Sequence, residues 1–192
     1  QFAYRCHHST ETAVVSVFNN IARSIDNNQI SALVLLDMSA AFDTVDHPIL
    51  MSVLEKRFGV QHKALRWFTS YSSNRTQSVY VGAYHPSPTT LHCGVPQGSV
   101  IGPAEYIVYT EELDSIIRPR KFDHHMYADD IQLLSVMSLA EVPQFRSKIE
   151  NCILAVRDWC SSRRLTLNPD KPELIWFASS SNLKKLLYIS TN

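Results

Sequence analysis

One short run of apolar residues does most to limit the folds open to this chain. Residues 32–36, Ala-Leu-Val-Leu-Leu, are followed directly by Asp37. Five apolar residues bounded by polar turns are typical of a strand that is buried on both faces. A carboxylate at the end of such a strand is costly to desolvate unless another group compensates its charge. The run therefore predicts a buried strand that ends in an acidic group.

Amphipathic patterns and capping residues predict helices before and after this strand. The expected helices run from Ser9 or Thr10 to the polar residues 26–28, from Asp46 to Gly59, and over 63–71, 98–117 and 143–160. In the first helix, an apolar stripe is formed by Val14, Val15, Val17, Phe18, Ile21, Ala22 and Ile25. The chain therefore contains enough amphipathic helix to back a sheet.

Short β-type segments lie between these helices. Strands are expected over residues 77–82, 89–95, 122–127, 131–136, 165–167 and 173–177. The first two of these would pair across the turn at residues 86–88. Because helices and strands are interleaved, often as hairpins, the sequence predicts an α+β or mixed α/β sheet domain.

Composition excludes several other classes of protein. The chain has 192 residues, 45% of them hydrophobic, and its 18 Lys and Arg balance its 18 Asp and Glu. This hydrophobic share excludes a disordered tail, and the zero net charge does not indicate an anionic partner. The longest purely apolar run is too short to cross a bilayer, so no membrane partner is expected. Gln1 is not an initiator residue, and the chain is expected to be a fragment of a longer protein.

The four cysteines do not indicate a disulfide framework. Cys6 and Cys93 stand alone in the sequence. Cys152 and Cys160 are eight residues apart on an expected helix, hence about 12 Å along its axis. A disulfide needs its Cα atoms within about 7 Å, so this pair cannot close. A reduced, intracellular setting is expected, either nuclear or cytoplasmic.

Three carboxylates are candidates for a chemical centre. Asp129 and Asp130 lie between two expected strands, where a tight turn would let both acids approach one ion. If the strand before Asp37 neighbours that hairpin, the three acids converge and repel one another unless divalent cations bind. Oxygen ligands favour Mg²⁺, and two ions about 3.5–4 Å apart would activate a 3′-hydroxyl and stabilise a leaving pyrophosphate. The alternative is ordinary turn and helix-cap chemistry at these positions.

A loop of turn residues precedes the fourth expected helix. Residues 94–99 read Gly-Val-Pro-Gln-Gly-Ser. Two glycines around a proline can bring the backbone close to a ligand at a helix N-terminus. A plain strand-to-helix turn explains the same residues, so the loop alone does not identify a site.

The order of these motifs resembles one known family. The matching segments are Gln1–Arg5, His8–Ala13, Leu35–His47, Gly94–Pro103, Tyr127–Asp130 and Leu167–Lys171. Together they resemble the reverse transcriptase of non-LTR (LINE-type, jockey-like) retrotransposons over nearly the whole chain. The resemblance implies a polymerase palm, with a mixed or antiparallel sheet backed by helices. It also implies the addition of dNTPs to a DNA primer on an RNA template, with two Mg²⁺ ions or with Mn²⁺ in their place.

The resemblance assigns the metal-binding acids and a selectivity residue. Asp37 and Asp129 would be the main metal-binding carboxylates, with Asp130 beside them. Phe42, five residues after Asp37, would lie under the incoming sugar and exclude a 2′-hydroxyl.

Further roles follow from the other motifs. Gln97 and Gly98 would help to position the nucleotide and the template pair, and Tyr127 would contact the nucleotide. Lys171 resembles the lysine that protonates or neutralises the leaving pyrophosphate. For Lys171, an exposed turn lysine is nearly as good an explanation.

Departures from the family pattern narrow these expectations. A fingers region is expected before Gln1 and a thumb after Asn192, so the chain would be a palm with partial fingers and no complete thumb. Because phosphate contacts dominate nucleic-acid affinity and the net charge is zero, weak template binding is expected. Residues 104–106 are Ala-Glu-Tyr where the family usually has Leu-Leu-Phe, so Glu105 would have to find an arginine or reach solvent.

Two rival functions stay open. The first keeps the fold without the activity, as an inactive retroelement-derived remnant or an interaction module. The second is a different palm enzyme, such as a viral RNA polymerase or a nucleotidyl cyclase. Phe42 argues against the second rival, because an enzyme that uses ribonucleotides should not put a bulky aromatic ring against the 2′ position.

Overall fold

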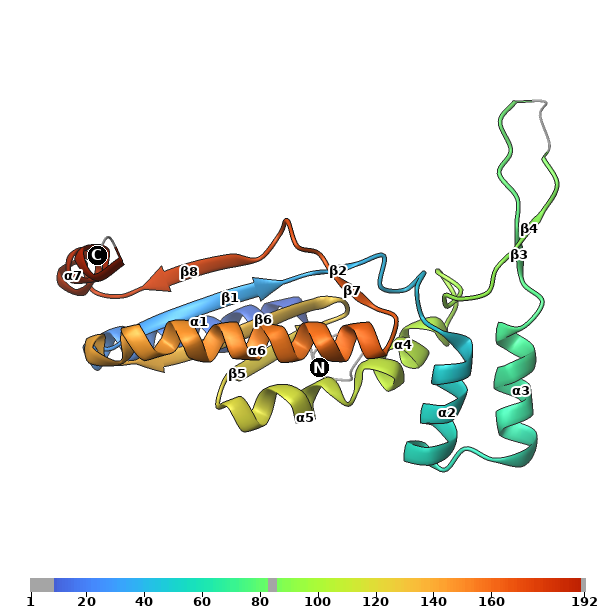
Figure 1. Cartoon of the computed structure of the whole chain (residues 1–192), viewed down its shortest axis with the longest axis horizontal. Coiled ribbons are helices and arrows are strands. Elements are labelled where there is room, and N and C mark those ends of the chain that lie inside the picture. Colours follow the sequence, from blue (N-terminus) through green and yellow to red (C-terminus); the bar gives the residue numbers. More distant parts are fainter. Residues whose placement is uncertain (1–8, 83–85, 191–192) are drawn as a thin grey trace. The chain divides into compact units, whose positions relative to one another are not determined.

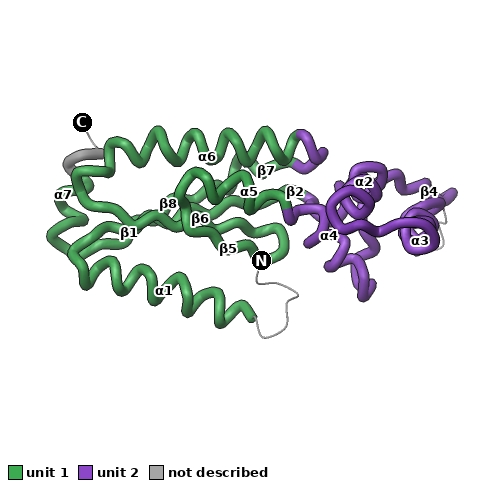
Figure 2. Tube along the Cα trace, turned by 90° about the horizontal axis from the view of Figure 1, so that it is seen from below, with its two compact units in different colours: residues 1–39, 112–161, 166–192 green, residues 40–111, 162–165 purple. Residues whose placement is uncertain are grey.

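The computed structural model describes residues 9–82 and 86–190 (Figure 1). The chain forms two compact units (Figure 2). Unit 1 comprises the described parts of residues 1–39, 112–161 and 166–192, and unit 2 comprises those of 40–111 and 162–165. Each unit therefore joins segments that are distant in the sequence.

Unit 1 contains a four-stranded antiparallel sheet in the order β5-β6-β1-β8. These strands are β1 (Ile30–Leu36), β5 (Asp123–Tyr127), β6 (Asp130–Met137) and β8 (Glu173–Phe177). A separate antiparallel pair joins β2 (Met38–Ser39) to β7 (Thr166–Leu167). Every strand expected in this unit is confirmed, and β2 is an addition to them.

The helices of unit 1 cover both faces of the sheet (Figure 2). They are α1 (Thr10–Asp26), α5 (Leu113–Ile117), α6 (Val142–Ser162) and α7 (Ser180–Ser190), with 3₁₀ turns at Arg118–Arg120 and Leu139–Glu141. On one face, Val17 of α1 packs against Leu33 of β1. On the other face, Phe145 of α6 contacts Trp176 of β8, with ring centroids 5.2 Å apart. Trp176 is opposite Ala32, and side chains alternate along a strand, so the two helices lie on opposite sides of β1.

The buried face of α1 differs from the expected stripe. Val14, Val15 and Phe18 are 63%, 55% and 67% exposed. The buried residues at Val17 and Ile21 are spaced by one helical turn, and they make the contact with the sheet. The stripe prediction was therefore too wide, because only a narrow row of α1 packs against β1 and β6.

Unit 2 contains three helices and a short hairpin. These elements are α2 (His47–Phe58), α3 (His62–Ser72), β3 (Thr76–Gln77), β4 (Thr89–Thr90) and α4 (Gly102–Thr110). Asp46 caps α2 by accepting a hydrogen bond from the Ile49 N–H at 2.9 Å. Gly59 ends α2 in a left-handed conformation with φ of 67°. Both predicted ends of this helix are confirmed.

The hairpin of unit 2 is shorter than predicted. Strands were expected over 77–82 and 89–95, but β3 and β4 pair over two residues each. All four paired residues are exposed. A strand pair without a buried face has little to stabilise its register beyond the first bonds.

The helix expected over 98–117 is also divided. It begins at Gly102, with Pro103 in its first turn, and α4 ends at Thr110 before α5 starts. Residues 98–101 lie outside any helix, and the Ser99 hydroxyl accepts a hydrogen bond from the Gly102 N–H at 2.9 Å. The loop at 94–99 therefore ends before the helix begins, and its amides are not the helix N-terminus.

No helix within the described ranges combines the length and the apolar content of a membrane span. Cys93, Cys152 and Cys160 are free thiols, which agrees with the predicted absence of a disulfide between the last two. Cys6 lies outside the described residues, as does the segment Gln1–Arg5 that contributed to the resemblance.

Candidate active site

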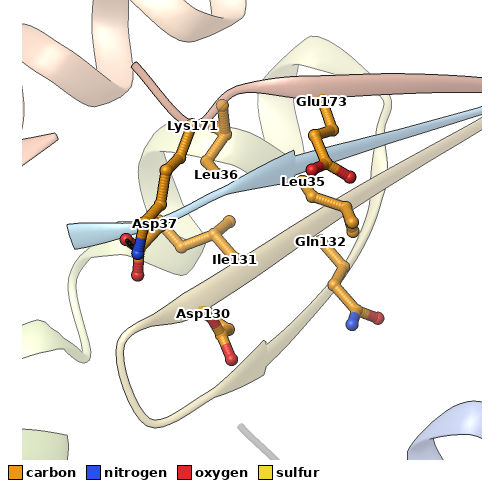
Figure 3. A pocket seen from close by; sticks show the side chains of 8 residues that line it. All are labelled: Leu35, Leu36, Asp37, Asp130, Ile131, Gln132, Lys171 and Glu173. Atoms are coloured by element: carbon orange, nitrogen blue, oxygen red, sulfur yellow. Dashed lines mark hydrogen bonds and ion pairs between the residues drawn. The ribbon is translucent and has the colours of Figure 1, made fainter. Parts of the chain in front are cut away.

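Asp37 follows the last residue of β1 and lies beside the β5–β6 hairpin. The strands β1 and β6 are antiparallel, with Leu36 opposite Ile131. Continuing this register by one residue puts Asp37 opposite Asp130, and opposite residues share a face of the sheet. Both acids line one pocket together with Lys171 (Figure 3). The antiparallel pairing thus brings two of the three predicted acids to the same place.

The third predicted acid lies in the tight turn between β5 and β6. Residues 128 and 129 form this turn, across which Tyr127 pairs with Asp130. Ala128 has φ of 53°, a left-handed conformation that costs a residue with a Cβ roughly 1–2 kcal/mol. Strain of this kind is concentrated at functional sites. Asp129 is next to the strained residue, and its charge adds to the larger effect of burial in raising the pKa of Asp130.

The charges in this pocket are unevenly balanced. The Lys171 ammonium donates a hydrogen bond to Asp37 Oδ2 at 2.9 Å and is the main reason that the pKa of Asp37 lies below its ordinary value. Burial, followed by the charges of Asp129 and Asp37, raises the pKa of Asp130. The pocket lining therefore has one ammonium, that of Lys171, against the three carboxyl groups of Asp37, Asp130 and Glu173, and the surplus negative charge favours a bound cation.

The donor atoms of the pocket suit a hard divalent cation. Carboxylate oxygens are the ligands that Mg²⁺ prefers, and Asp37 and Asp130 both supply them here. Across residues 9–82 and 86–190, no three Asp, Glu, His or Cys side chains are arranged as a ready-made ion site. The Lys171 ammonium already contacts the Asp37 carboxylate. The oxygen chemistry thus fits Mg²⁺, while the predicted pair of ions stays a prediction.

The segment after β7 holds Lys171 against Asp37. The Asn168 N–H donates to the Asp37 carbonyl at 2.9 Å, and its side-chain amide reaches Asp37 Oδ2 at 3.4 Å. The side-chain oxygen Oδ1 of Asn168 also accepts a hydrogen bond from the Asp170 N–H at 3.1 Å. Lys171 is 65% exposed, so it is a turn lysine and an ion-pair partner at once. Asn168 was not predicted as a site residue, although it lies inside the motif Leu167–Lys171.

In unit 2, Phe42 and the loop at 94–99 are bonded to each other. The Val95 N–H donates to the Phe42 carbonyl at 2.9 Å, and the Gln97 amide donates to Asp43 Oδ1 at 2.9 Å. The Phe42 ring stacks on Tyr106 of α4, with centroids 4.4 Å apart and planes 23° apart. Tyr106 is fully buried, so it is a fixed support for the Phe42 ring.

The other two predicted nucleotide contacts lie at exposed positions. Gly98 is exposed in unit 2 and has φ of 79°. Tyr127 ends β5 in unit 1 and is 36% exposed. The predicted set is therefore divided, with the three acids, Tyr127 and Lys171 in unit 1 and with Phe42, Gln97 and Gly98 in unit 2.

Glu105 is a buried acid in α4. It is 2% exposed, and neither carboxyl oxygen has a hydrogen-bond partner. Burial raises its pKa, and the nearby charge of Arg75 opposes that shift in part. The sequence predicted that Glu105 would either find an arginine or reach solvent. Arg75 is close enough for its charge to act on Glu105, but it makes no hydrogen bond to the carboxyl group, and Glu105 does not reach solvent.

Replacing Glu105 with Met should stabilise the protein. The folded state has the higher pKa, so it retains the proton longer than the unfolded chain does. The stability of the wild-type protein should therefore fall as the pH rises from the ordinary value of 4.5 through the folded-state pKa. At pH 8, Glu105→Met should raise the free energy of unfolding by about 1–3 kcal/mol, because an uncompensated buried carboxyl group is removed. Urea unfolding at pH 5 and pH 8 measures both effects.

The exposed Glu55 of α2 provides the control for this substitution. Glu55→Met should change the free energy of unfolding by less than about 0.5 kcal/mol at either pH. A Glu105→Met protein with unchanged stability at pH 8 would mean that the carboxyl group is compensated in solution.

Comparison with known proteins identifies the family. The sequence pattern of the family described as "Reverse transcriptase (RNA-dependent DNA polymerase)" matches residues 1–186. The chain belongs to the reverse transcriptase family. This agrees with the order of motifs and with the acids that line the pocket at the end of β1.

The curated relatives of this reverse transcriptase domain come from mobile elements. It is 32% identical over 176 residues to the "Probable RNA-directed DNA polymerase from transposon BS" of Drosophila melanogaster, covering 89% of this chain and 19% of that protein. It is 27% identical over 184 residues to the "RNA-directed DNA polymerase from mobile element jockey" of the same species, covering 93% of this chain and 20% of that protein. The chain thus spans about a fifth of the length of these relatives. The predicted resemblance to jockey-like elements is confirmed.

Solved structures of telomerase share the fold of the reverse transcriptase domain. A telomerase from Candida albicans, solved with a fragment of telomeric RNA, gives a TM-score of 0.63 at 16% identity, covering 88% of this chain and 31% of that one. An apo telomerase from Candida tropicalis gives a TM-score of 0.63 at 14% identity, covering 88% of this chain and 35% of that one. The mixed α+β fold with antiparallel sheets therefore agrees with the predicted class.

Proposed function

We propose that this reverse transcriptase domain adds deoxynucleotides to the 3′ end of a DNA primer on an RNA template. The observation that carries the proposal is the pocket at the end of β1, where Asp37, Asp130 and Lys171 lie together. Two Mg²⁺ ions, or Mn²⁺ in their place, would activate the primer 3′-hydroxyl and stabilise the leaving pyrophosphate. The surplus of carboxylates in the pocket supports this use.

The residues of unit 1 have distinct proposed roles. Asp37 and Asp129 hold the cations, and Asp130 adds its charge beside them. Lys171 neutralises or protonates the pyrophosphate as it leaves, and its short contact with Asp37 keeps the ammonium within the pocket. Tyr127 contacts the nucleotide from the end of β5. Catalysis on this proposal is mainly positioning and charge stabilisation.

Unit 1 would be the polymerase palm and unit 2 a part of the fingers. In unit 2, Phe42 would meet the sugar of the incoming nucleotide, and Gln97 and Gly98 would position the base pair. The stacking of Phe42 on Tyr106 supports this role, because a fixed ring discriminates by shape better than a mobile one.

Primer extension tests the proposal. The chain would replace the matching segment of the jockey polymerase, so that the flanking parts of a relative are supplied. The chimera should extend a DNA primer on an RNA template with added Mg²⁺, and Asp129→Asn should abolish the signal. A folded chimera without activity, alongside an active jockey polymerase, would refute the proposal.

Phe42→Val should raise the incorporation of ribonucleotides. Removing the ring leaves room for a 2′-hydroxyl, so the ratio of kcat/KM for rNTP to that for dNTP should increase about 10- to 100-fold. Single-nucleotide incorporation by the chimera measures the ratio. Phe42→Tyr keeps the ring and should leave the ratio within about threefold. An unchanged ratio in Phe42→Val would contradict the role of Phe42.

A second candidate is an inactive remnant with the same fold. The buried Glu105 without a hydrogen-bond partner favours this candidate, because such a residue lowers stability without an evident gain in function. If Glu105→Leu restored synthesis to a chimera that is otherwise inactive, this second candidate would be supported.

A further inference from the structure

The net charge of the chain is zero, but its acidic and basic residues are unevenly distributed along the sequence. Residues 56–104 contain no Asp or Glu, and they contain five basic residues, Lys56, Arg57, Lys63, Arg66 and Arg75. This whole segment belongs to unit 2. A stretch of this length with one sign of charge produces a local positive potential that the overall sum does not reveal.

Among these cations, the two on α3 are available for a ligand. Arg57 forms an ion pair with Glu111 at 2.7 Å, and Arg75 donates to the Gly94 carbonyl at 2.7 Å. Lys63 and Arg66 are exposed on α3, and neither has an ion pair within the described residues. Their charges are therefore not neutralised by the protein itself.

The same helix carries an aromatic pair, of which Trp67 is exposed and Tyr71 is half-buried. Trp67 is 48% exposed and stacks on Tyr71, with ring centroids 5.2 Å apart and planes 12° apart. Residues four apart are neighbours on a helix, so Lys63, Trp67 and Tyr71 form one row. Arg66 lies three residues after Lys63 and flanks this row. We call Lys63, Arg66, Trp67 and Tyr71 the α3 face.

Few side chains of α3 are used in packing. Among its residues only Ser72 is buried, and the helix has no acidic residue. Trp67 is 48% exposed, so covering its ring with a ligand would remove further apolar surface from water. The combination of an aromatic platform and unpaired cations suits a ligand with flat rings and anionic groups.

We propose that the α3 face binds single-stranded RNA, with a base stacked on Trp67 and phosphates beside Lys63 and Arg66. Stacking accepts any base, and the cations track the backbone of the strand. Duplex RNA buries its bases and cannot use the tryptophan. The proposal rests on the proposed function, because a polymerase that copies RNA must hold a single-stranded template.

Fluorescence anisotropy with labelled oligo(U) of about 20 nucleotides tests the proposal on the whole chain. Trp67→Ala should weaken binding about 10-fold, and Trp67→Phe should retain most of the affinity, because stacking needs a ring. Phe18→Ala provides the matched control, since Phe18 is an exposed aromatic residue of unit 1, 67% accessible. It should bind as the wild type does. Thermal unfolding checks that each variant is folded.

Salt dependence separates the cations from the ring. Lys63→Gln with Arg66→Gln should reduce the slope of log affinity against log salt by about 1.4, as expected for two lost phosphate contacts on a single strand. Trp67→Ala should leave this slope unchanged. Equal affinities for Trp67→Ala and Phe18→Ala would overturn the proposal. Poly-glutamate can be added as a competitor at the same concentration of negative charge as the RNA. If it displaced the RNA, and if Trp67→Ala did not change RNA affinity, the ligand of the α3 face would instead be an acidic peptide.

The binding assay contains EDTA and no nucleotide, so it does not depend on the polymerase reaction. Binding with no synthesis by the chimera would refute the proposed function alone. Synthesis with no contribution from Trp67 would refute the α3 face alone.

Discussion

Asp37→Asn should reduce the rate of nucleotide addition by the chimera by about 100- to 1,000-fold. The amide keeps the size of the side chain but loses the charge that a cation in the pocket requires. Removing one group that stabilises charge in a transition state typically costs this much in rate. Asp37 also anchors Lys171, so the substitution leaves the ammonium without its partner at 2.9 Å. Single-turnover incorporation on an RNA template measures the rate.

Another carboxylate of the same pocket provides a matched control for the loss of charge at Asp37. Glu173 lines the pocket from the start of β8, and no role in binding cations is assigned to it. Glu173→Gln removes one negative charge at a similar place and should change the rate less than about threefold. If Asp37→Asn and Glu173→Gln lowered the rate equally, the pocket would act through its total charge, and Asp37 would have no special role.

The local signals around the site were sufficient to predict its parts. The run at 32–36 became β1, and the acids at 129–130 lie where β5 turns into β6. Each of these depends on neighbouring residues, on turn chemistry and on burial along one strand. The sequence therefore located the strands and the turn that carry these acids, while their chemical role stays a prediction.

The order of strands was beyond this kind of reasoning. The sequence left open whether the strand before Asp37 neighbours the hairpin, because pairing between distant segments depends on the whole sheet. The contact of Lys171 with Asp37 joins residues 134 positions apart. From the sequence, Lys171 was either an exposed turn lysine or a site residue, and only the fold reveals that it is both exposed and paired with Asp37.

Summed quantities also concealed features of the chain. The zero net charge led to an expectation of weak template binding, but the acid-free stretch at 56–104 is visible only when charge is read along the chain. The stripe of α1 was likewise read as one broad apolar face, whereas the sheet uses the row of Val17 and Ile21. In both cases, the positions of individual residues predicted the structure better than the net charge or the overall apolar pattern did.

Gly94→Ala should lower the free energy of unfolding by about 3 kcal/mol. Gly94 has φ of 86°, and an added Cβ would lie 2.9 Å from the Asp43 carbonyl oxygen. Backbone cannot move aside as a flexible side chain can, so the left-handed strain and the overlap add together. The Gly94 N–H donates to the Val45 carbonyl at 2.8 Å, and this bond holds the two segments at that distance. Urea unfolding measures the loss.

Gly59 separates the two causes. It has φ of 67°, and an added Cβ would meet nothing within 4 Å. Gly59→Ala therefore carries the conformational strain alone and should cost about 1 kcal/mol. The remaining loss in Gly94→Ala reports the close approach of the loop to residues 42–45, and faster hydrogen exchange at the Val95 N–H should accompany it. Equal losses for the two variants would mean that the loop does not pack against this segment, and that Phe42 and Gln97 are not held together in unit 2.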